Sequence, residues 1–408
     1  MININVIGLG YVGLTTALAF AFKGLNVVGV DTSVNLLNKL SNGHLSIHEP
    51  NLKKILNKNI KNKKIVFKKN TEIRHDSINI IFVCVGTPQK RNGSVDLRQI
   101  KNVIKKINKK IKNEKVIIVI KSTVPPGSIE EIKKISRLKQ NINYVSNPEF
   151  LREGSAWNDV INADKILIGA ENNFSIKYLK MIYKKFNGKI VLSNFETAEF
   201  TKYLSNSILA NLISFSNNMA ILSEKIGKID TKKAFDSVSL DKRWYGKPAK
   251  IIDYFKPGIG YGGYCLPKDV EAINYLSKKN KVKTNMLNEI SKVNKFVIHH
   301  HFSKIKKLPR ASKIYILGLS FKPNSNDLRY SKSIEFVNLL IKNKFKNLTL
   351  CDPVCINELK KIFKNKVKYK IKPIYEKKAK YILTTAWKEY IIFLKKIDDK
   401  NKFNLRYE

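Results

Sequence analysis

The stretch Asn3-Ile4-Asn5-Val6-Ile7-Gly8-Leu9-Gly10-Tyr11-Val12-Gly13 decides the fold of this chain. Residues 3–8 predict a buried strand, and the small and apolar residues 12–23 predict a helix. Residues 26–30 predict a second strand, which ends at Asp31. A strand, a helix and a strand in so short a span are typical of a βαβ unit, so we expect the chain to open with a parallel sheet.

The three glycines of this stretch stand where a dinucleotide-binding turn needs them. Gly8 permits a tight turn, Gly10 lets a pyrophosphate approach the backbone, and Gly13 lets the helix pack closely on the strand. The N-terminus of the helix then faces the phosphates. Asp31 follows Gly13 by 18 residues, at a position where a carboxylate accepts from the adenosine ribose and repels a 2′-phosphate. The pattern therefore predicts NAD as the cofactor, in preference to NADP.

The alternation of apolar runs and charged helical stretches continues beyond this unit. The further β-branched runs are residues 64–67, 79–85, 116–120 and 165–169. They predict a doubly wound parallel sheet with helices on both faces. From Phe195 to Gly227 the chain holds no proline and repeats apolar residues every three or four positions. This pattern predicts one long helix that forms a domain spine and a dimer contact.

A second alternating pattern fills the last part of the chain. Its predicted elements are strands at 313–319, 347–351 and 380–385 and a helix at 331–343. Its first turn, Gly318-Leu319-Ser320, lacks the triple glycine, so we expect no second NAD site. The predicted fold class is α/β, with two Rossmann-like doubly wound parallel-sheet domains joined by a long-helix, all-α central dimerisation domain. The predicted domains are residues 1–194, 195–306 and 307–408.

The 408 residues carry a formal charge of +45, with 77 lysines and arginines against 32 acidic residues. Only nine of the 77 are arginines, the residue that base and phosphate recognition favours, and no zinc-finger spacing is present. We therefore interpret the lysines as solvated surface charge, whose field attracts an anionic substrate and cofactor, and expect no nucleic acid as partner. Four cysteines fit no secreted framework, the first residues suit a strand rather than a signal peptide, and no apolar run could span a membrane. A cytoplasmic protein without a membrane segment is expected.

The run Gly262-Gly263-Tyr264-Cys265-Leu266-Pro267-Lys268-Asp269 is the strongest candidate for covalent chemistry. With Gly258 and Gly260 before it, this segment can pass close to a neighbouring group. If a helix begins at Leu266, the helix dipole and Lys268 both favour a thiolate at Cys265. Because a thiolate adds readily to an aldehyde, we predict that Cys265 is a covalent nucleophile and not a small buried side chain.

The other cysteines and the histidine run predict no metal site. Cys84 lies on an apolar strand and is interpreted as core packing. Cys351 and Cys355 flank Asp352-Pro353 and have no second pair, which disfavours zinc. The run His299-His300-His301 has no carboxylate partner pattern, so we interpret it as an exposed helix face.

Two polar groups lie where ligands are expected. Asn147-Pro148-Glu149-Phe150-Leu151-Arg152-Glu153-Gly154 follows a strand-like run, so it lies at the carboxyl edge of the sheet. That position favours a role in a site over a solvated ion-pair cluster. Lys202 and Asn206 are four residues apart on the long helix and share one face. The sequence leaves open whether they point to solvent or to the cysteine loop.

Taken together, these motifs resemble the nucleotide-sugar dehydrogenase family that includes UDP-glucose and GDP-mannose dehydrogenases, over nearly the whole chain. The segment 260–269 is most similar to short bacterial UDP-glucose 6-dehydrogenases. The other matching runs are Gly86-Thr87-Pro88, residues 121–127, residues 148–153, Lys202 with Asn206, Tyr254, Phe321-Lys322-Pro323 and Asp327-Leu328-Arg329.

The resemblance implies that the primary alcohol of UDP-glucose is oxidised twice, to UDP-glucuronate, with two NAD reduced. Lys202, Asp269 and a water held by Thr123 and Asp269 surround the reacting hydroxyl in the family. Cys265 then forms a thiohemiacetal and a thioester, while Lys202 and Asn206 stabilise the oxyanion. Water cleaves the thioester with Glu149 or Asp269 as base.

The resemblance also implies two sets of binding residues. Cofactor contacts are implied for Gly8, Gly10, Tyr11, Val12, Gly13, Asp31, Thr87, Thr123, Glu153, Lys268 and Arg329. Contacts to the UDP-sugar are implied for Glu149, Phe150, Leu151, Arg152, Glu153, Lys202, Asn206, Tyr254, Gly258, Gly262 and Lys322. The last domain would bind the UDP-sugar, and the enzyme would be a homodimer.

Two departures from the family leave the sugar open. The segment 243–248 is longer than in the short bacterial enzymes, and Tyr330 replaces an acid common after the arginine. Another nucleotide sugar, such as a UDP-N-acetylhexosamine or GDP-mannose, is the alternative substrate. A lysine-rich nucleic-acid-binding protein would explain the charge of +45 but would leave the glycine runs without a role.

Overall fold

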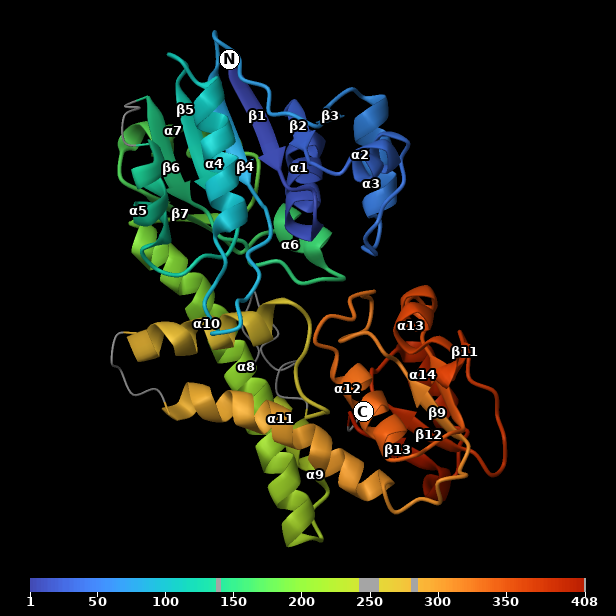
Figure 1. Cartoon of the computed structure of the whole chain (residues 1–408). Helices are drawn as coiled ribbons and strands as arrows, with labels where there is room; N and C mark the ends of the chain where they lie inside the picture. The colour runs from blue at the N-terminus through green and yellow to red at the C-terminus, as the bar shows by residue number, and fades with distance from the viewer. Residues whose placement is uncertain (137–140, 242–256, 280–284, 407–408) are drawn as a thin grey trace. The chain divides into compact units, whose positions relative to one another are not determined.

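The structure is a computed structural model that describes residues 1–136, 141–241, 257–279 and 285–406. The chain divides into two compact units, Met1–Ser205 and Asn206–Glu408 (Figure 1). Helix α8 (Phe195–Ile226) begins in the first unit and continues into the second. The prediction of one long helix from Phe195 is therefore confirmed.

The first unit contains, in its described residues, an eight-stranded sheet in the order β3-β2-β1-β4-β5-β6-β7-β8. Pairing is parallel from β3 through β6 and again between β7 and β8. The strands are β1 (Ile2–Ile7), β2 (Val27–Val30), β3 (Ile65–Lys68), β4 (Ile78–Val83), β5 (Val116–Ile120), β6 (Ile142–Ser146), β7 (Lys165–Ala170) and β8 (Lys189–Ser193). The predicted Rossmann-like architecture is present, with β8 as an unpredicted addition.

We predicted a parallel sheet, but one pair of neighbouring strands in it is antiparallel. Strand β7 runs antiparallel to β6 and overlaps it in only two pairs, Val145 with Ala170 and Ser146 with Gly169. The connection between them carries only the six-residue helix α6 (Ala156–Ile161), which rises about 9 Å and cannot return the chain along the sheet face. Residues 147–164 therefore begin and end at the carboxyl edge of β6.

Both faces of the first sheet are covered by helices with matching apolar stripes. Leu14, Leu18 and Phe20 of α1 share one core with residues of α3 and α7, and Ile100 and Ile104 of α4 share the opposite core with α5. The helices are α1 (Tyr11–Phe22), α2 (Val34–Ser41), α3 (Leu52–Lys61), α4 (Arg98–Lys110), α5 (Ser128–Lys133) and α7 (Asn173–Tyr183). The sheet is doubly wound, as expected.

The second unit combines a helical part with a parallel sheet in the order β11-β10-β9-β12-β13. Its strands are β9 (Ile314–Leu317), β10 (Leu348–Cys351), β11 (Lys368–Lys370), β12 (Lys380–Leu383) and β13 (Lys402–Asn404). Its helices after α8 are α9 (Thr231–Ser239), α10 (Cys265–Lys279), α11 (Asn285–Ile305), α12 (Lys332–Lys342), α13 (Ile356–Phe363) and α14 (Lys388–Leu394). The second Rossmann-like fold is confirmed; the three-residue strands β11 and β13 and the helices α13 and α14 were not predicted.

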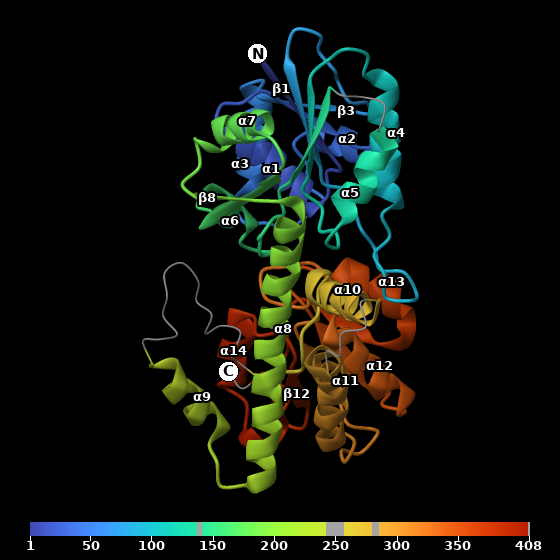
Figure 2. The same ribbon diagram turned by 90° about the vertical axis from the view of Figure 1, so that its left-hand side faces the viewer.

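Two cores hold the second sheet, and a smaller one holds the helices. Helices α11, α12 and α13 cover one face, and α14 with Trp387 covers the other. Ala210 of α8, Val270 of α10 and Ile290 of α11 meet around Tyr261, so the segment before the cysteine helix is part of the helical core. Figure 2 shows α8 along its length; its 32 residues span about 48 Å.

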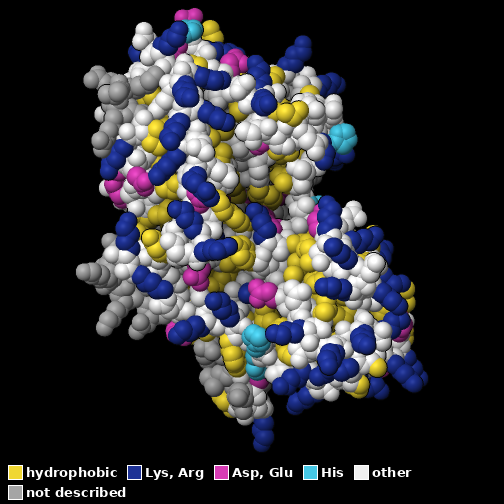
Figure 3. Space-filling view, viewed as in Figure 1, with side chains coloured by type: hydrophobic (Ala, Val, Ile, Leu, Met, Phe, Trp, Pro, Cys, Tyr) yellow, Lys and Arg dark blue, Asp and Glu magenta, His cyan; other side chains and the backbone are white. Residues whose placement is uncertain are grey.

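Basic side chains are spread over the visible surface of both units and do not gather in one patch (Figure 3). This distribution agrees with the interpretation of the lysines as mostly solvated charge. Among the helices in the described part of the chain, none has the length and apolar character needed to cross a membrane.

Candidate active site

The glycine turn after β1 has a separate physical reason for each of its three glycines. Gly8 has a φ of +88°, which L side chains rarely adopt. A Cβ on Gly13 would lie 1.8 Å from the carbonyl oxygen of Gly8, so only glycine lets α1 pack this closely. A Cβ on Gly10 would meet nothing within 4 Å, so the space above the start of α1 is open.

The start of α1 and the end of β2 are suited to a dinucleotide. Gly10 is the N-cap of α1 and provides no side-chain cap, which leaves the first N–H groups of the helix for a bound anion. Asp31 accepts from the N–H of Leu9 at 2.8 Å and of Ser33 at 2.9 Å and keeps a partly exposed carboxylate. These residues fit the phosphate and ribose of NAD.

Thr87 and Thr123 join the ends of two neighbouring strands. The Thr87 hydroxyl, which is buried, donates to the carbonyl oxygen of Thr123 at 3.0 Å. The two threonines follow β4 and β5, so the structure places this predicted pair together at the carboxyl edge of the sheet.

Glu49 is a residue of this region that the sequence reasoning missed. Its buried carboxylate accepts from the Tyr11 hydroxyl, from the N–H of Gly154 at 2.9 Å and from the N–H of Trp157 at 3.2 Å. The Tyr11 hydroxyl also accepts from the N–H of Gly154 at 2.6 Å. Glu49 and Tyr11 thereby tie the turn at Gly154 to the start of α1.

Glu149 and Lys202 form a buried ion pair in the first unit, with 3.1 Å between Oε1 and Nζ. The other carboxylate oxygen of Glu149 accepts from the N–H of Leu151 at 2.5 Å. Burial by itself would raise the pKa of Glu149, but Lys202, the Leu151 N–H and the more distant Lys121 outweigh it, so the pKa lies below its usual value. Glu149 is therefore ionised at neutral pH and can accept a proton.

The neighbours of Glu149 make different contacts. Lys165 and Lys202 lie above the Phe150 ring, with Nζ 4.3 Å and 5.4 Å from its centroid. Arg152 binds Asp159 of α6 through Nη2 at 2.6 Å and Nε at 3.0 Å. The sequence reasoning did not single out Asp159, which holds the guanidinium close to the turn.

In the second unit α10 begins at Cys265, one residue before the helix start at Leu266 that we considered from the sequence, and the thiol is partly exposed. Asp269 lies one turn further and is fully buried; its carboxylate accepts from the Asn206 amide and from Lys268 Nζ, the latter at 2.5 Å. Burial by itself would lower the pKa of Lys268, but Asp269 and Cys265 outweigh it and raise that pKa overall. Asn206 therefore points to the cysteine helix, which the sequence left open.

The glycines before Cys265 approach other parts of the same unit. A Cβ on Gly262 would lie 2.5 Å from the Tyr330 carbonyl oxygen, and one on Gly263 would lie 2.8 Å from the Phe321 ring. A Cβ on Gly258 would lie 2.8 Å from Arg406 Nη1. The neighbouring group that these glycines were expected to approach is thus the chain itself.

Two predicted binding residues, Arg329 and Lys322, contact aromatic side chains of this unit, and a third, Tyr254, lies outside the described part. Arg329 lies above the Tyr264 ring at 4.5 Å and donates to Asp327 at 2.7 Å. Lys322 Nζ lies 5.4 Å from the centroid of the Phe321 ring. Tyr254 and the segment 243–248 fall outside the described residues.

The remaining cysteines are poor nucleophiles, and one histidine prediction is wrong. Burial raises the pKa of Cys84 and of Cys351 to about 12, and burial with Asp352 raises that of Cys355 further. His301 is buried and not exposed, with Nε2 3.3 Å from the Gly258 carbonyl oxygen and a pKa lowered by burial to about 4. Among the described side chains, no group of three or more His, Cys, Asp or Glu could hold a metal.

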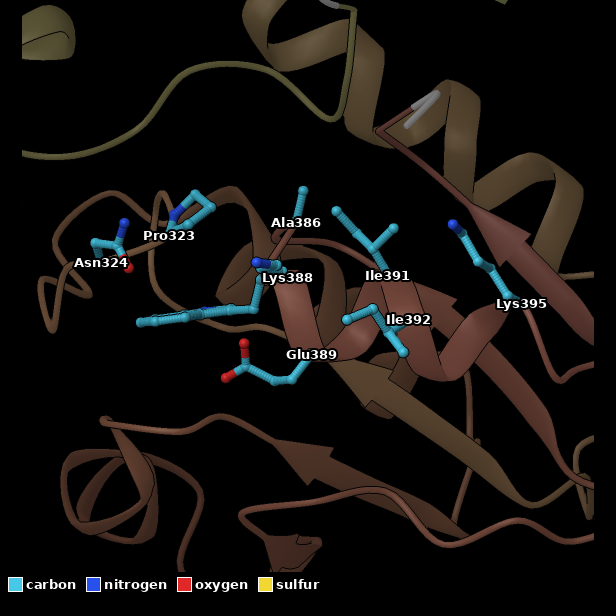
Figure 4. Close-up of a pocket in the computed structure, with 9 residues that line it drawn as sticks. Pro323, Asn324, Ala386, Lys388, Glu389, Ile391, Ile392 and Lys395 are labelled. Carbon is cyan, nitrogen blue, oxygen red and sulfur yellow. The ribbon is translucent and has the colours of Figure 1, made fainter.

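A pocket of about 420 Å³ opens in the second unit, and its lining includes Pro323, which follows the predicted binding residue Lys322 (Figure 4). Pro323 and Asn324 form one side of it, and Ala386 and residues of α14 form the other. Its lining is Pro323, Asn324, Ala386, Trp387, Lys388, Glu389, Ile391, Ile392 and Lys395.

Three family models cover most of the chain. The NAD-binding domain of the UDP-glucose/GDP-mannose dehydrogenase family matches residues 2–187, its central domain matches residues 196–296, and its UDP-binding domain matches residues 315–405.

Individual relatives agree with these matches. The chain is 34% identical over 376 residues to the UDP-glucose 6-dehydrogenase TuaD of Bacillus subtilis, covering 90% of this chain and 80% of the relative. It is 36% identical over 372 residues to the UDP-glucose 6-dehydrogenase of Rickettsia prowazekii, covering 89% and 84%. The structure of a UDP-glucose dehydrogenase from Pyrobaculum islandicum matches with a TM-score of 0.89 and 30% identity, covering 100% of this chain and 94% of that one.

Proposed function

Because the chain belongs to the UDP-glucose/GDP-mannose dehydrogenase family, we propose that it oxidises UDP-glucose to UDP-glucuronate, with two NAD reduced per sugar. One observation carries this proposal: Cys265 begins α10, and Asp269, one turn further, is held by Asn206 and Lys268. A thiol at a helix N-terminus with this buried polar group behind it suits covalent capture of an aldehyde. The names of the relatives support UDP-glucose as the sugar.

The first oxidation converts the primary alcohol to an aldehyde. NAD, when bound, accepts the hydride from the substrate carbon; the chain's own residues must manage the proton and the charge. As the family resemblance implies, Lys202, Asp269 and a water held by Thr123 and Asp269 surround the hydroxyl that loses its proton. The buried positions of Lys202 and Asp269 support this assignment, because bulk water competes little with buried groups for the substrate hydroxyl.

The second oxidation proceeds on Cys265. The thiolate adds to the aldehyde carbon, and the resulting oxyanion is stabilised by Lys202 and Asn206, which both donate hydrogen bonds. Transfer of the second hydride to a second NAD would leave a thioester on Cys265. Glu149 or Asp269 then removes a proton from water, and the water oxygen displaces the sulfur. The lowered pKa of Glu149 keeps its carboxylate ionised at neutral pH, which is the form that can accept a proton.

In this scheme, as the family resemblance implies, Lys202 and Asn206 act on the same substrate. Lys202 and Asn206 lie one turn apart on the same helix, which supports a joint role although Lys202 binds Glu149 and Asn206 binds Asp269. For the other residues that contact NAD or the UDP-sugar, we keep the assignments that the family resemblance implies. We further propose the division into an NAD-binding domain (1–194), a helical central domain (195–306) and a UDP-sugar-binding domain (307–408).

We also propose that the enzyme is a homodimer joined along α8. Four large apolar side chains of this helix, spaced by roughly one or two turns, are about half exposed: Phe200 at 45%, Leu204 at 46%, Ile208 at 50% and Phe215 at 53%. Such a stripe is costly in water and suits a twofold contact with the same stripe of a second copy. Light scattering should give twice the chain mass, and Leu204→Lys with Ile208→Lys should give the mass of one chain.

A substrate panel tests the proposed reaction. UDP-glucose, a UDP-N-acetylhexosamine and GDP-mannose are each supplied with NAD, and NADH is counted per sugar consumed. Two NADH per UDP-glucose and little turnover of the others are expected. One NADH per sugar would reduce the proposal to an alcohol dehydrogenase, and preferential turnover of another sugar would change the substrate.

Replacing the nucleophile tests the mechanism. Cys265→Ser should slow turnover by orders of magnitude while NAD binding survives, because the glycine turn is untouched. A trapped aldehyde or acyl intermediate is expected in the variant. Near-normal steady-state turnover in Cys265→Ser would exclude a covalent role for this residue.

A further inference from the structure

Asn147, two residues before Glu149, is held from three different elements. Lys121, directly after β5, donates to Asn147 Oδ1 at 3.1 Å, and the Tyr183 hydroxyl of α7 donates to the same oxygen. The Asn147 amide in turn donates to the Leu167 carbonyl oxygen of β7 at 2.7 Å. Asn147 is 1% exposed, so these contacts are shielded from water and restrict it to one position.

This restriction is passed on to Glu149 through a short and stiff link. Pro148 separates the two residues, and the proline ring fixes its own φ and limits the backbone of the residue before it. The Glu149 carboxylate is then oriented by Lys202 Nζ at 3.1 Å and by the Leu151 N–H at 2.5 Å. The position of Asn147 therefore restricts where the backbone of Glu149 lies, and with it the point from which the carboxylate reaches Lys202 and the Leu151 N–H.

Lys121 is an unusual residue to find at this place. Its side chain is 6% exposed, and both of its recorded hydrogen bonds go to neutral oxygens of Asn147, at 3.1 Å and 3.5 Å. Among the described residues no carboxylate lies within ion-pair distance of it. Burial lowers the pKa of Lys121, and a buried lysine that donates to neutral acceptors destabilises a fold, so its presence suggests a functional reason. Asn147, which accepts both hydrogen bonds from Lys121, indicates what that reason is.

We propose that Lys121, acting through Asn147, is a positioning residue that holds Glu149 where it removes a proton from the water that cleaves the thioester. In this step Glu149 takes one proton from water, the water oxygen bonds to the thioester carbon, and the bond to Cys265 Sγ breaks with the sulfur leaving as thiolate. No electrons leave or enter. The inference rests on the proposed function, in which Glu149 is the base.

The test separates the last step from the two oxidations. Lys121→Met keeps the length of the side chain and removes its hydrogen bonds. On mixing with NAD and UDP-glucose it should still release two NADH per subunit in the first turnover, but steady turnover should fall on the order of tenfold or more. Intact-protein mass spectrometry after acid quench should find the acyl group on Cys265, which should not accumulate in the wild type.

Two companion variants strengthen the test. Tyr183→Phe removes the other donor to Asn147 Oδ1 and keeps the charge of Lys121, so it should accumulate the same acyl-enzyme to a smaller extent. Lys332→Met, in the second unit, removes a lysine that is 8% exposed and paired only with Glu335, and should accumulate none. If Lys121→Met does not fold, Tyr183→Phe alone decides the matter.

Two results would overturn the inference. One is a Lys121→Met enzyme with unchanged turnover and no acyl-enzyme; the other is equal loss of the first-turnover NADH and of steady turnover, which a purely structural role produces. Glu149→Gln separates this failure from failure of the proposed function. If Glu149→Gln accumulates the acyl-enzyme and Lys121→Met does not, the positioning role fails and the mechanism stands. If neither the wild type nor Glu149→Gln ever forms a thioester, the proposed function itself fails.

Discussion

Each of the two sheets contains a strand followed by a glycine turn, with an aspartate at the end of the neighbouring strand. The two turns differ in which groups bind that aspartate. Gly8 and Gly318 follow the first strand of each sheet with φ values of +88° and +84°. The next residue, Leu9 or Leu319, donates its N–H to an aspartate at the end of the neighbouring strand, Asp31 at 2.8 Å and Asp352 at 2.7 Å. The backbone geometry is thus shared.

The second turn is saturated by groups of its own chain. Asp352 is fully buried and accepts also from the N–H groups of Ser320 at 3.1 Å, Val354 at 3.0 Å and Cys355 at 2.9 Å. Asp31 accepts from two N–H groups and stays partly exposed, and the position after Leu9 is a glycine with open space above it. A strand-end carboxylate therefore marks a ligand site only where the fold leaves part of it unused.

The largest effect on stability is expected when a side chain is added at Gly13, where α1 already packs directly on the turn after β1. A Cβ in Gly13→Ala would lie 1.8 Å from the Gly8 carbonyl oxygen, so α1 must move away from β1. We expect a loss of about 3 kcal/mol or more in the free energy of unfolding, measured by urea denaturation.

Gly10→Ala is the matched control, because its Cβ meets nothing within 4 Å. Its free energy of unfolding should stay within about 0.5 kcal/mol of the wild type, while the KM for NAD should rise on the order of tenfold as the Cβ enters the space for the phosphates. Normal NAD affinity in Gly10→Ala would contradict the assignment of that open space.

The next largest effect should distinguish the two aspartates by stability. Asp352→Ala leaves four N–H groups without an acceptor, three of them buried, and should cost about 3 kcal/mol or more. Asp31→Ala leaves two N–H groups at a partly exposed position and should cost about 1 kcal/mol. Urea denaturation followed by circular dichroism measures both; equal losses would show that the second carboxylate is no more structural than the first.

The first turn could be predicted from the sequence because its requirements are local. Gly8, Gly10 and Gly13 each answer a steric demand of a neighbouring residue, and the start of α10 at Cys265 follows from the residues around it. The direction of β7 could not be predicted, because apolar periodicity indicates a strand but not its orientation.

The polar contacts of the site escaped prediction for a different reason. Lys121, Lys202 and Lys268 are 6%, 4% and 2% exposed. In a chain with a charge of +45, the sequence does not distinguish these buried lysines from the many exposed ones. Their partners can be far along the sequence: Lys121 binds Asn147, 26 residues away, and Tyr11 binds Glu49, 38 residues away. Only the tertiary fold identifies these pairs.

A third prediction concerns the choice between NAD and NADP. It depends on the partly exposed side of the Asp31 carboxylate, which remains available to a ligand. Asp31→Ala removes both the acceptor for the ribose hydroxyls and the charge that repels a 2′-phosphate. The kcat/KM for NAD should fall on the order of tenfold, and that for NADP should rise, so their ratio falls further. Measuring both cofactors with the same sugar checks this. An unchanged ratio would mean that Asp31 acts, like Asp352, only on the backbone of its turn.

The smallest effect is expected from the tie between the first turn and the segment that follows β6. Tyr11→Phe keeps the ring but removes the hydroxyl shared by Glu49 and the Gly154 N–H, while Glu49 still accepts from Gly154 at 2.9 Å. The variant should therefore lose only about 1 kcal/mol of stability. Burial and Glu49 raise the pKa of Tyr11 far above its usual value, so the hydroxyl keeps its proton and the loss should be equal at pH 6 and pH 9. A loss that disappears at pH 9 would show that Tyr11 ionises there and that Glu49 does not hold its proton in place.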